Sequence, residues 1–293
     1  DLQNPDRVLI GGDNNEAIET LANIYKQWIS DEKIIRTNLW SSELSKLAAN
    51  AFLAQRVSSI NSLSAFCEES GANIQEVSKA IGLDSRIGDK FLKSGPGFGG
   101  SCFKKDILNL VYLSKSLGLN EVANYWNAVI QINEWQMVRI ARIIVYSLFG
   151  SVTNKKIGVL GFAFKADTND IRESPAIEIC KNLLNEGAIL SIHDPKVEED
   201  DLKKILPKSS HDQADWHFAK NIIDVFQDSD AVVILTEWEE YKKIDWDSNV
   251  NLMRRPSWIF DTRNLVELNS IDSTKVNIWQ TGNGSLNFDR KII

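Results

Sequence analysis

A glycine-rich segment that ends in a cysteine is the part of the sequence best suited to chemistry. It reads Gly97-Phe98-Gly99-Gly100-Ser101-Cys102 and leads into a predicted helix. Glycines let a backbone approach a ligand closely and expose its N–H groups. A cysteine in the first turn of a helix lies beside free N–H groups and the positive end of the helix dipole, which favour the thiolate. Cys102 is therefore a candidate nucleophile, and the alternative is a buried structural cysteine.

Charged and amide side chains stand at spacings that would bring them to the same site. Asp106 follows Cys102 by one helical turn, so its carboxylate shares that face of the helix. Lys46 and Asn50 lie four residues apart on a long predicted helix, among small and apolar neighbours. Such a pair could stabilise an oxyanion. A solvent-facing lysine next to a surface asparagine would give the same pattern.

A second glycine turn, at residues 158–165, invites comparison with dinucleotide-binding turns because Asp194 follows at the end of the next predicted strand. The glycine spacing is incomplete, so we expect no NAD at this turn. Lys165, with Arg172 nearby, could hold a phosphate or the edge of a cofactor. Arg263 comes directly after another predicted strand, where parallel sheets bind ligands.

Two kinds of periodicity divide the chain near residue 150. Apolar residues at three- and four-residue spacing predict helices over residues 16–28, 42–70, 73–82, 101–117 and 121–149. Ser41 or Ser42 is the expected cap of the second helix and Ser101 of the fourth. The later part predicts strands over residues 156–161, 189–193, 231–236, 258–261 and 276–280, and a helix over 174–186. This alternation predicts an α/β chain: a helical region with a long connecting helix, then a Rossmann-like, doubly wound parallel sheet.

Two segments fit this pattern less simply. Residues 197–220 are polar and weakly patterned, and we interpret them as a long loop with a short helix. Residues 7–12 resemble a strand for which the few preceding residues offer no partner. We therefore expect residue 1 to be a truncation or a domain cut.

Composition excludes several classes of protein. The chain has 293 residues, 43% hydrophobic and 25% charged, which suits two soluble domains. A net charge of −7 gives no general attraction to nucleic acid or to an anionic membrane. Three sparse cysteines indicate a reducing compartment such as the cytoplasm, and Cys67 and Cys180 fall in apolar helical patterns typical of a core. Three scattered histidines predict no metal site.

Three segments together resemble the UDP-glucose 6-dehydrogenases: residues 41–50, Gly97–Cys102 and Gly161–Lys165. The likeness runs from residue 4 to at least residue 263. It implies that residues 1–37 are the end of a largely missing NAD-binding domain. Residues 38–150 would be a central helical domain for catalysis and dimerisation, and residues 151–293 a UDP-binding Rossmann-like domain.

The resemblance also implies a reaction. NAD would accept four electrons in all from UDP-glucose, giving UDP-glucuronate through a thiohemiacetal and a thioester on Cys102. A covalent intermediate suits the chemistry, because only the trapped aldehyde presents a second hydride. Lys46 and Asn50 would stabilise the oxyanion, and Asp106 would position or activate water.

Further site residues follow from the same resemblance. Arg86 would reach the substrate of a neighbouring subunit in a homodimer that builds into a hexamer. The substrate-binding set is Lys46, Leu47, Ala48, Ala49, Asn50, Arg86, Lys93, Ser94, Gly95, Pro96, Gly97, Phe98, Gly99, Phe164, Lys165 and Arg263. The residues expected to border the cofactor are Cys102, Phe103, Lys104, Lys105 and Arg172. Two alternatives stay open: a dehydrogenase of another nucleotide sugar, such as UDP-N-acetylmannosamine or GDP-mannose, and a non-catalytic module that binds UDP-sugar and oligomerises.

Overall fold

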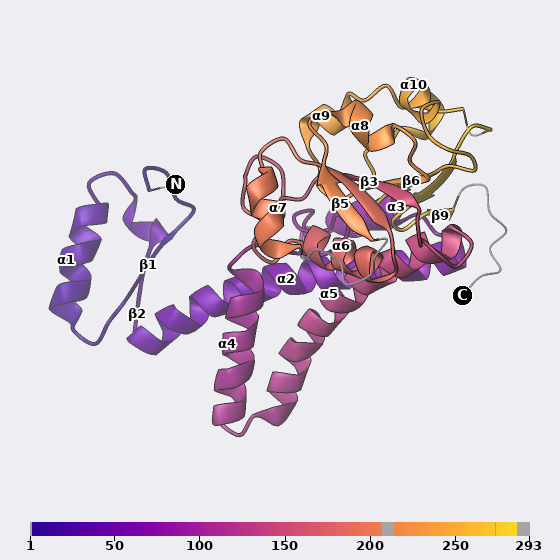
Figure 1. Ribbon diagram of the computed structural model, residues 1–293. Coiled ribbons are helices and arrows are strands. Elements are labelled where there is room, and N and C mark those ends of the chain that lie inside the picture. Colours follow the sequence, from indigo (N-terminus) through magenta and orange to yellow (C-terminus); the bar gives the residue numbers. More distant parts are fainter. Residues whose placement is uncertain (1, 207–213, 273, 286–293) are drawn as a thin grey trace.

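A computed structural model describes residues 2–206, 214–272 and 274–285 (Figure 1). The predicted α/β class is confirmed. A small lobe at the N-terminus leads into the long helix α2, the helices α4 and α5 form a hairpin that projects from it, and a mostly parallel sheet lies on its other side. Within these described ranges, no helix is long and apolar enough to cross a membrane.

The N-terminal lobe is a parallel strand pair with one crossover helix. Strand β1 (Val8–Gly11) pairs with β2 (Ile34–Thr37), and α1 (Asn15–Tyr25) and a 3-10 turn, η1 (Asp31–Lys33), lie between them in the chain. The partner of the first strand therefore follows it in the sequence. Apolar periodicity did not predict this partner, because only Ile34 of the four residues of β2 is buried.

Four helices build the middle of the molecule: α2 (Leu39–Ser70), α3 (Ile74–Gly82), α4 (Phe103–Ser116) and α5 (Asn120–Ser147). The predicted serine cap of α2 is wrong. The Asn38 side chain accepts a hydrogen bond from the Ser41 backbone N–H at 2.8 Å, so the helix starts earlier. Ala51 and Ala54 are fully buried against α4 and α5, because small side chains allow helices to pack closely.

Seven strands form one sheet in the order β5-β4-β3-β6-β7-β8-β9, parallel except for the last pair. The chain runs outward from β3 to β5 and then returns beside β3, which creates a switch point where such sheets bind ligands. The strands are β3 (Lys156–Leu160), β4 (Ile189–His193), β5 (Asp215–Phe218), β6 (Ala231–Ile234), β7 (Trp258–Asp261), β8 (Asn277–Gln280) and β9 (Gly284–Ser285). The remaining elements are α6 (Pro175–Asn185), α7 (Glu199–Ile205), α8 (Ile222–Phe226), α9 (Glu239–Lys242), α10 (Trp246–Val250) and the 3-10 turn η2 (Leu268–Ser270).

The interpretation of residues 197–220 as a loop with a short helix is partly wrong. The helix is present as α7, but β5 forms the edge of the sheet, and its alternating half-buried pattern is too short to stand out in the sequence. The middle of this predicted loop, residues 207–213, lies outside the described residues.

The long helix α5 serves two cores. Its first half packs with α2 and α4 through Val129 and Ile130. Its second half contributes Ile140 and Ile144, both fully buried, to the core of the sheet. The expected connecting helix is thus shared by both parts, so it fixes how the glycine-rich segment meets the sheet.

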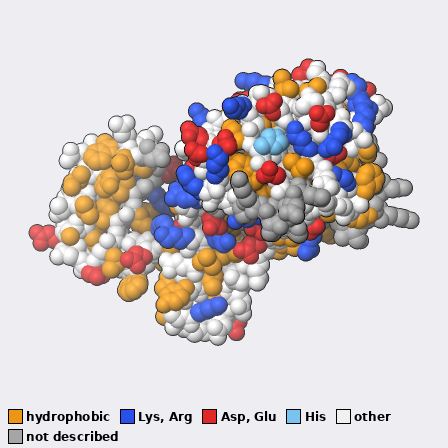
Figure 2. Space-filling view, in the orientation of Figure 1, with side chains coloured by type: hydrophobic (Ala, Val, Ile, Leu, Met, Phe, Trp, Pro, Cys, Tyr) orange, Lys and Arg blue, Asp and Glu red, His pale blue; other side chains and the backbone are white. Residues whose placement is uncertain are grey.

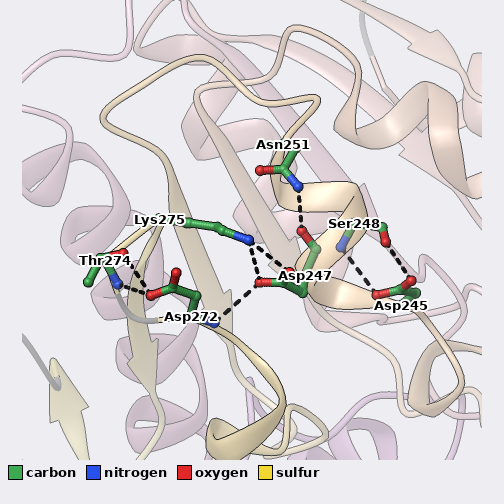
Figure 3. Close-up of polar contacts among 7 residues, drawn as sticks. All are labelled: Asp245, Asp247, Ser248, Asn251, Asp272, Thr274 and Lys275. Carbon is green, nitrogen blue, oxygen red and sulfur yellow. Dashed lines mark hydrogen bonds and ion pairs between the residues drawn. The ribbon is translucent and has the colours of Figure 1, made fainter.

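Ion pairs and caps fasten the last strands of the sheet (Figure 3). The Lys275 ammonium lies 3.0 and 2.8 Å from the two carboxylate oxygens of Asp247 at the start of α10. Asp245 caps the same helix through the Ser248 backbone N–H, at 3.2 Å. The Asp272 backbone N–H also donates to Asp247, at 3.4 Å. These contacts hold the segment that enters β8 against α10.

We predict that Gly161→Ala lowers the free energy of unfolding by roughly 2–5 kcal/mol. Gly161 has φ +94°, and an added Cβ would lie 2.4 Å from Thr236 Cβ and 2.7 Å from its backbone nitrogen. Gly150→Ala is the matched control, because Gly150 also has a positive φ (+75°) but open space around it, and it should cost only about 1 kcal/mol. Urea unfolding of both variants tests this, and equal losses would contradict it.

Candidate active site

The carboxylate of Asp106 is the centre of the site. Its side chain is 6% exposed, and it accepts from the Lys46 ammonium at 2.7 and 2.5 Å and from the Asn50 amide nitrogen at 2.5 Å. Burial alone would raise the pKa of Asp106, but the hydrogen bonds and charge from Lys46 and Asn50, with Lys105, hold that pKa below its ordinary value. The structure thus brings together three of the four predicted catalytic side chains as one bonded group.

Cys102 stands at the start of α4, one turn before Asp106, whose backbone N–H donates to the Cys102 carbonyl at 2.9 Å. The cysteine is exposed, and the Ser101 hydroxyl lies 3.7 Å from its sulfur. Cys102 itself is the N-cap residue and no side chain caps the helix, so the predicted Ser101 cap is wrong. By contrast, Cys67 and Cys180 are buried as expected, and burial raises the pKa of both thiols.

Three buried amide side chains hold the glycine-rich loop. Asn133 on α5 forms a pair of hydrogen bonds with the backbone of Phe98, at 2.8 and 3.1 Å. Gln136 donates to the Gly95 carbonyl at 3.0 Å, and Asn61 on α2 accepts from the Gly95 N–H at 2.9 Å. A Cβ on Gly97 (φ +135°) would lie 2.8 Å from Asn133 Oδ1, so the close approach requires glycine. The loop is therefore fixed by the helices before any ligand arrives.

These three amides were not among the residues predicted from the sequence. Asn61 comes eleven residues after Asn50, a spacing that returns to the same face of a helix, and this signal could have found it. Asn133 and Gln136, three apart on α5, share a face in the same way.

Loops at the carboxyl ends of β3 and β7 cover the other side of the glycine-rich loop. The Gly100 N–H donates to the Arg172 carbonyl at 2.9 Å, and a Cβ on Gly99 would lie 3.0 Å from Phe164 Cβ. A Cβ on Gly95 would lie 3.3 Å from Arg263 Nη1. The predicted residues of the helical region and of the sheet thus meet along one boundary. We call this boundary the seam: the glycine-rich loop lies on one side, and Phe164, Arg172 and Arg263 lie on the other.

Arg263 is held rigidly at this seam. Its Nε donates to the Leu235 carbonyl at 2.9 Å, and its Nη1 lies 3.0 Å from Glu237 Oε2. Burial lowers the pKa of Arg263, and the carboxylate of Glu237 opposes that shift. Lys165, in the loop after β3, is exposed, with its ammonium 5.5 Å from the centre of the Phe164 ring. Arg263 and Lys165 are cations that could receive phosphate oxygens.

The other predicted residues divide between the seam and the surface. Leu47, Ser94, Pro96 and Phe98 are buried, Ala48, Ala49 and Phe103 are half-buried, and Lys93 and Lys105 are exposed. Two of the predicted arginines pair with a carboxylate two residues away in the chain: Arg86 with Asp84 and Arg172 with Asp170, each at 2.7 Å. The hydrogen bonds and the ion pair of the Arg86 side chain thus go to Asp84 and not to the glycine-rich loop, within the described residues.

Lys104 links α4 by ion pairs to α5 and to the residue before the Ser174 cap of α6. Its ammonium lies 3.4 Å from Glu134 of α5 and 3.3 Å from Glu173. These three side chains line a small hollow together with Phe98 and Met137. Burial would lower the pKa of Lys104, but the two carboxylates raise it above its ordinary value.

The glycine turn after β3 is closed by the protein itself. One carboxylate oxygen of Asp194 accepts from the backbone N–H groups of Phe162 and Ala163, at 2.7 and 2.9 Å, and from the Trp238 indole at 3.2 Å. In a dinucleotide-binding turn, such N–H groups face a pyrophosphate and the acidic residue faces a ribose. The residues at this turn therefore do not fit NAD.

Two domain models of one protein family match this chain. The model for the central domain of the UDP-glucose/GDP-mannose dehydrogenase family matches residues 40–135, and the model for the UDP-binding domain of that family matches residues 158–268. The chain belongs to the UDP-glucose/GDP-mannose dehydrogenase family.

Individual relatives are similar over most of this chain. It is 49% identical to UDP-glucose 6-dehydrogenase 1 of Glycine max over 292 residues, and 51% identical to UDP-glucose 6-dehydrogenase of Gallus gallus over 278 residues. The matches cover 92% and 91% of this chain but 60% and 56% of the relatives. The chain thus spans less than two thirds of the length of these relatives.

Solved structures show the same fold. A UDP-glucose dehydrogenase from Pyrobaculum islandicum matches 97% of this chain and 60% of its own, with a TM-score of 0.81 and 30% identity. The UDP-N-acetyl-mannosamine dehydrogenase from Staphylococcus aureus matches 94% of this chain and 58% of its own, with a TM-score of 0.67 and 25% identity.

We predict that Asp106→Asn destabilises the protein at neutral pH and that the difference from wild type narrows in acid. The folded pKa of Asp106 is lowered, so its carboxylate stabilises the fold above the unfolded value of about 3.9, and this contribution is lost as the pH falls through the folded pKa. Thermal unfolding of wild type and Asp106→Asn from pH 7 to pH 3 measures the difference in stability. Asp89→Asn, at an exposed position, is the control. A pH-independent difference would contradict the ion pair.

Proposed function

We propose that this chain is the sugar-nucleotide-binding and catalytic part of an NAD-dependent UDP-glucose 6-dehydrogenase that forms UDP-glucuronate. The observation that carries the proposal is the exposed Cys102 one turn from the bonded group of Asp106, Lys46 and Asn50, beside a preformed glycine-rich loop. Residues 1–37 would belong to the NAD-binding domain, 38–150 to the catalytic and dimerisation domain, and 151–293 to the UDP-binding domain.

The nucleotide would bind along the seam. The loop backbone from Lys93 to Gly99 would lie against the sugar and the phosphates, with Leu47, Ala48 and Ala49 as the small, apolar wall on α2. Arg263 and Lys165 would receive phosphate charge, because both are cations at or near the carboxyl ends of strands. The Phe164 ring, half-buried beside Gly100, gives a flat surface for the base or the sugar.

Cys102 would carry the covalent chemistry. Its thiolate adds to C6 of the aldehyde, forming the C–S bond while the carbonyl electron pair moves to oxygen. Lys46 has three N–H donors and Asn50 has two, so each keeps one for this oxyanion while it holds Asp106. After the second oxidation, water attacks the thioester, the C–S bond breaks, and the thiolate is restored. Asp106 would accept the proton of that water.

NAD supplies the hydride acceptor for both oxidations when it is bound. On this chain, the residues that would border it are Cys102, Phe103, Lys104, Lys105 and Arg172. Exposed cations suit an anionic cofactor here, and Lys105 and Arg172 are both exposed. Lys104 keeps this edge in place through Glu134 and Glu173.

Replacing the nucleophile tests the mechanism. We expect Cys102→Ala in the full-length enzyme to lower the rate of UDP-glucuronate formation roughly a thousandfold or more, because no other exposed thiol lies in the described part of the chain. Binding of UDP should remain within about threefold of wild type, since the proposed mechanism places no contact between the Cys102 sulfur and the nucleotide. NADH production and UDP calorimetry measure the two effects.

Cys67→Ala is the matched control, because it removes a buried thiol outside the site and should leave turnover unchanged. Turnover of Cys102→Ala at the wild-type rate would refute the covalent mechanism. A panel of UDP-glucose, UDP-N-acetylmannosamine and GDP-mannose assigns the sugar, and turnover of UDP-glucose alone is the expected result. Ligand binding without turnover in the full-length enzyme would favour a non-catalytic module instead.

We also propose that the chain self-associates through its helices, as a homodimer that builds into a hexamer. Large apolar side chains are exposed along the helical region, such as Phe52, Phe66 and Leu117, at 61%, 68% and 74%. Figure 2 shows hydrophobic side chains gathered toward the tip of the α4–α5 hairpin and over the N-terminal lobe. Arg86, which is 86% exposed on its own subunit, would then reach the substrate of the next one.

Sedimentation velocity tests the association. Phe66→Asp should reduce the apparent mass, because it places a charge in an apolar interface. Ile223→Asp, at an exposed position on α8, should leave the mass unchanged. A monomeric wild type, or equal effects of the two substitutions, would contradict the proposed interface.

A further inference from the structure

A chain of buried polar contacts runs from the turn after β8 to the glycine-rich loop. Glu68, at the end of α2, has a side chain that is 6% exposed. One of its carboxylate oxygens accepts from the Gly282 backbone N–H at 2.8 Å, and the other pairs with the guanidinium of Arg139 on α5. Arg139 is 9% exposed, and its other Nη lies 3.4 Å from Gln136 Oε1.

Gln136 carries this connection to the loop. It is fully buried, and its Nε2 donates to the Gly95 carbonyl at 3.0 Å. Gly95 is also the residue whose Cβ would meet Arg263 Nη1, at 3.3 Å. Gly95 is thus in contact both with the buried polar chain and with a cation of the proposed nucleotide site.

Stability alone does not account for these residues. A buried ion pair loses the hydration of two charges, and apolar side chains of similar volume often stabilise a core equally well. Burial raises the pKa of Glu68, and the charge of Arg139 and the N–H of Gly282 only partly offset that effect. Directional bonds give a fixed geometry that apolar packing does not.

We infer that Glu68, Arg139 and Gln136 are positioning residues that fix Gly95 against Arg263 and so set the affinity for the nucleotide. The mechanism above uses none of the three. The effect on affinity rests on the proposed function, whereas the effect on the loop does not. The turn after β8 would contribute because Gly282 holds Glu68, and an added Cβ there would lie 2.1 Å from Ile74.

The test compares Gln136→Glu with Gln136→Met. Glutamate keeps an oxygen for Arg139 and removes the donor to Gly95, whereas methionine removes both. We expect both variants to speed hydrogen exchange at the loop amides of residues 95 and 97–100, and to weaken binding of UDP roughly 3- to 10-fold. Gln131→Met, at an exposed position on the same helix, should change neither.

Arg139→Lys, matched by the exposed Arg142→Lys, covers the case in which a Gln136 variant fails to fold. Arg139→Lys keeps the positive charge next to Glu68 but loses the second guanidinium nitrogen, which contacts Gln136. It should therefore also speed hydrogen exchange of the loop and weaken binding of UDP. Wild-type exchange and affinity in folded Gln136→Glu would overturn the inference. If the wild type bound no UDP, the proposed function would fail, and unchanged loop exchange in the variants would overturn the inference separately.

Discussion

The buried carboxylate of Asp106 is the contact on which the site depends, because it joins α4 to α2. A carboxylate with 6% exposure needs partners, and only Lys46 and Asn50, four residues apart on α2, bond to it among the described side chains. Their bonds set the distance between the helices, and Cys102 stands one turn away as a result. The same group can therefore hold the fold together and offer its remaining N–H donors to a substrate.

The glycine-rich loop depends on a second set of buried polar groups. Asn61, Asn133 and Gln136 bind the backbone of this loop at Gly95 and Phe98, so side chains of α2 and α5 fix its conformation there. From the side of the sheet, the Arg172 carbonyl accepts a hydrogen bond from the Gly100 N–H, and Arg263 lies against Gly95. Because α5 packs in both cores, the two sides of the seam are held by one rigid element.

Sequence periodicity predicted the long helices and the strands that are buried along most of their length, such as β6, β7 and β8. It failed for β2 and β5, most of whose residues are exposed or half-buried, and at the starts of α2 and α4, where Asn38 and Cys102 stand at the cap. Helical spacing suggested the pairing of Cys102 with Asp106. The joining of Asp106 to Lys46, 60 residues away, and the buried amides behind the loop come from tertiary packing, which no local pattern encodes.

The proposed function requires that the chain bind a sugar nucleotide at the seam and not a dinucleotide at the turn that Asp194 closes. The most direct measurement is calorimetric titration of the chain with UDP-glucose and, separately, with NAD. We expect saturable heat with UDP-glucose, in the absence of NAD, and no tight binding of NAD. Tight NAD binding that Gly161→Ala abolishes, together with no heat from UDP-glucose, would contradict this assignment.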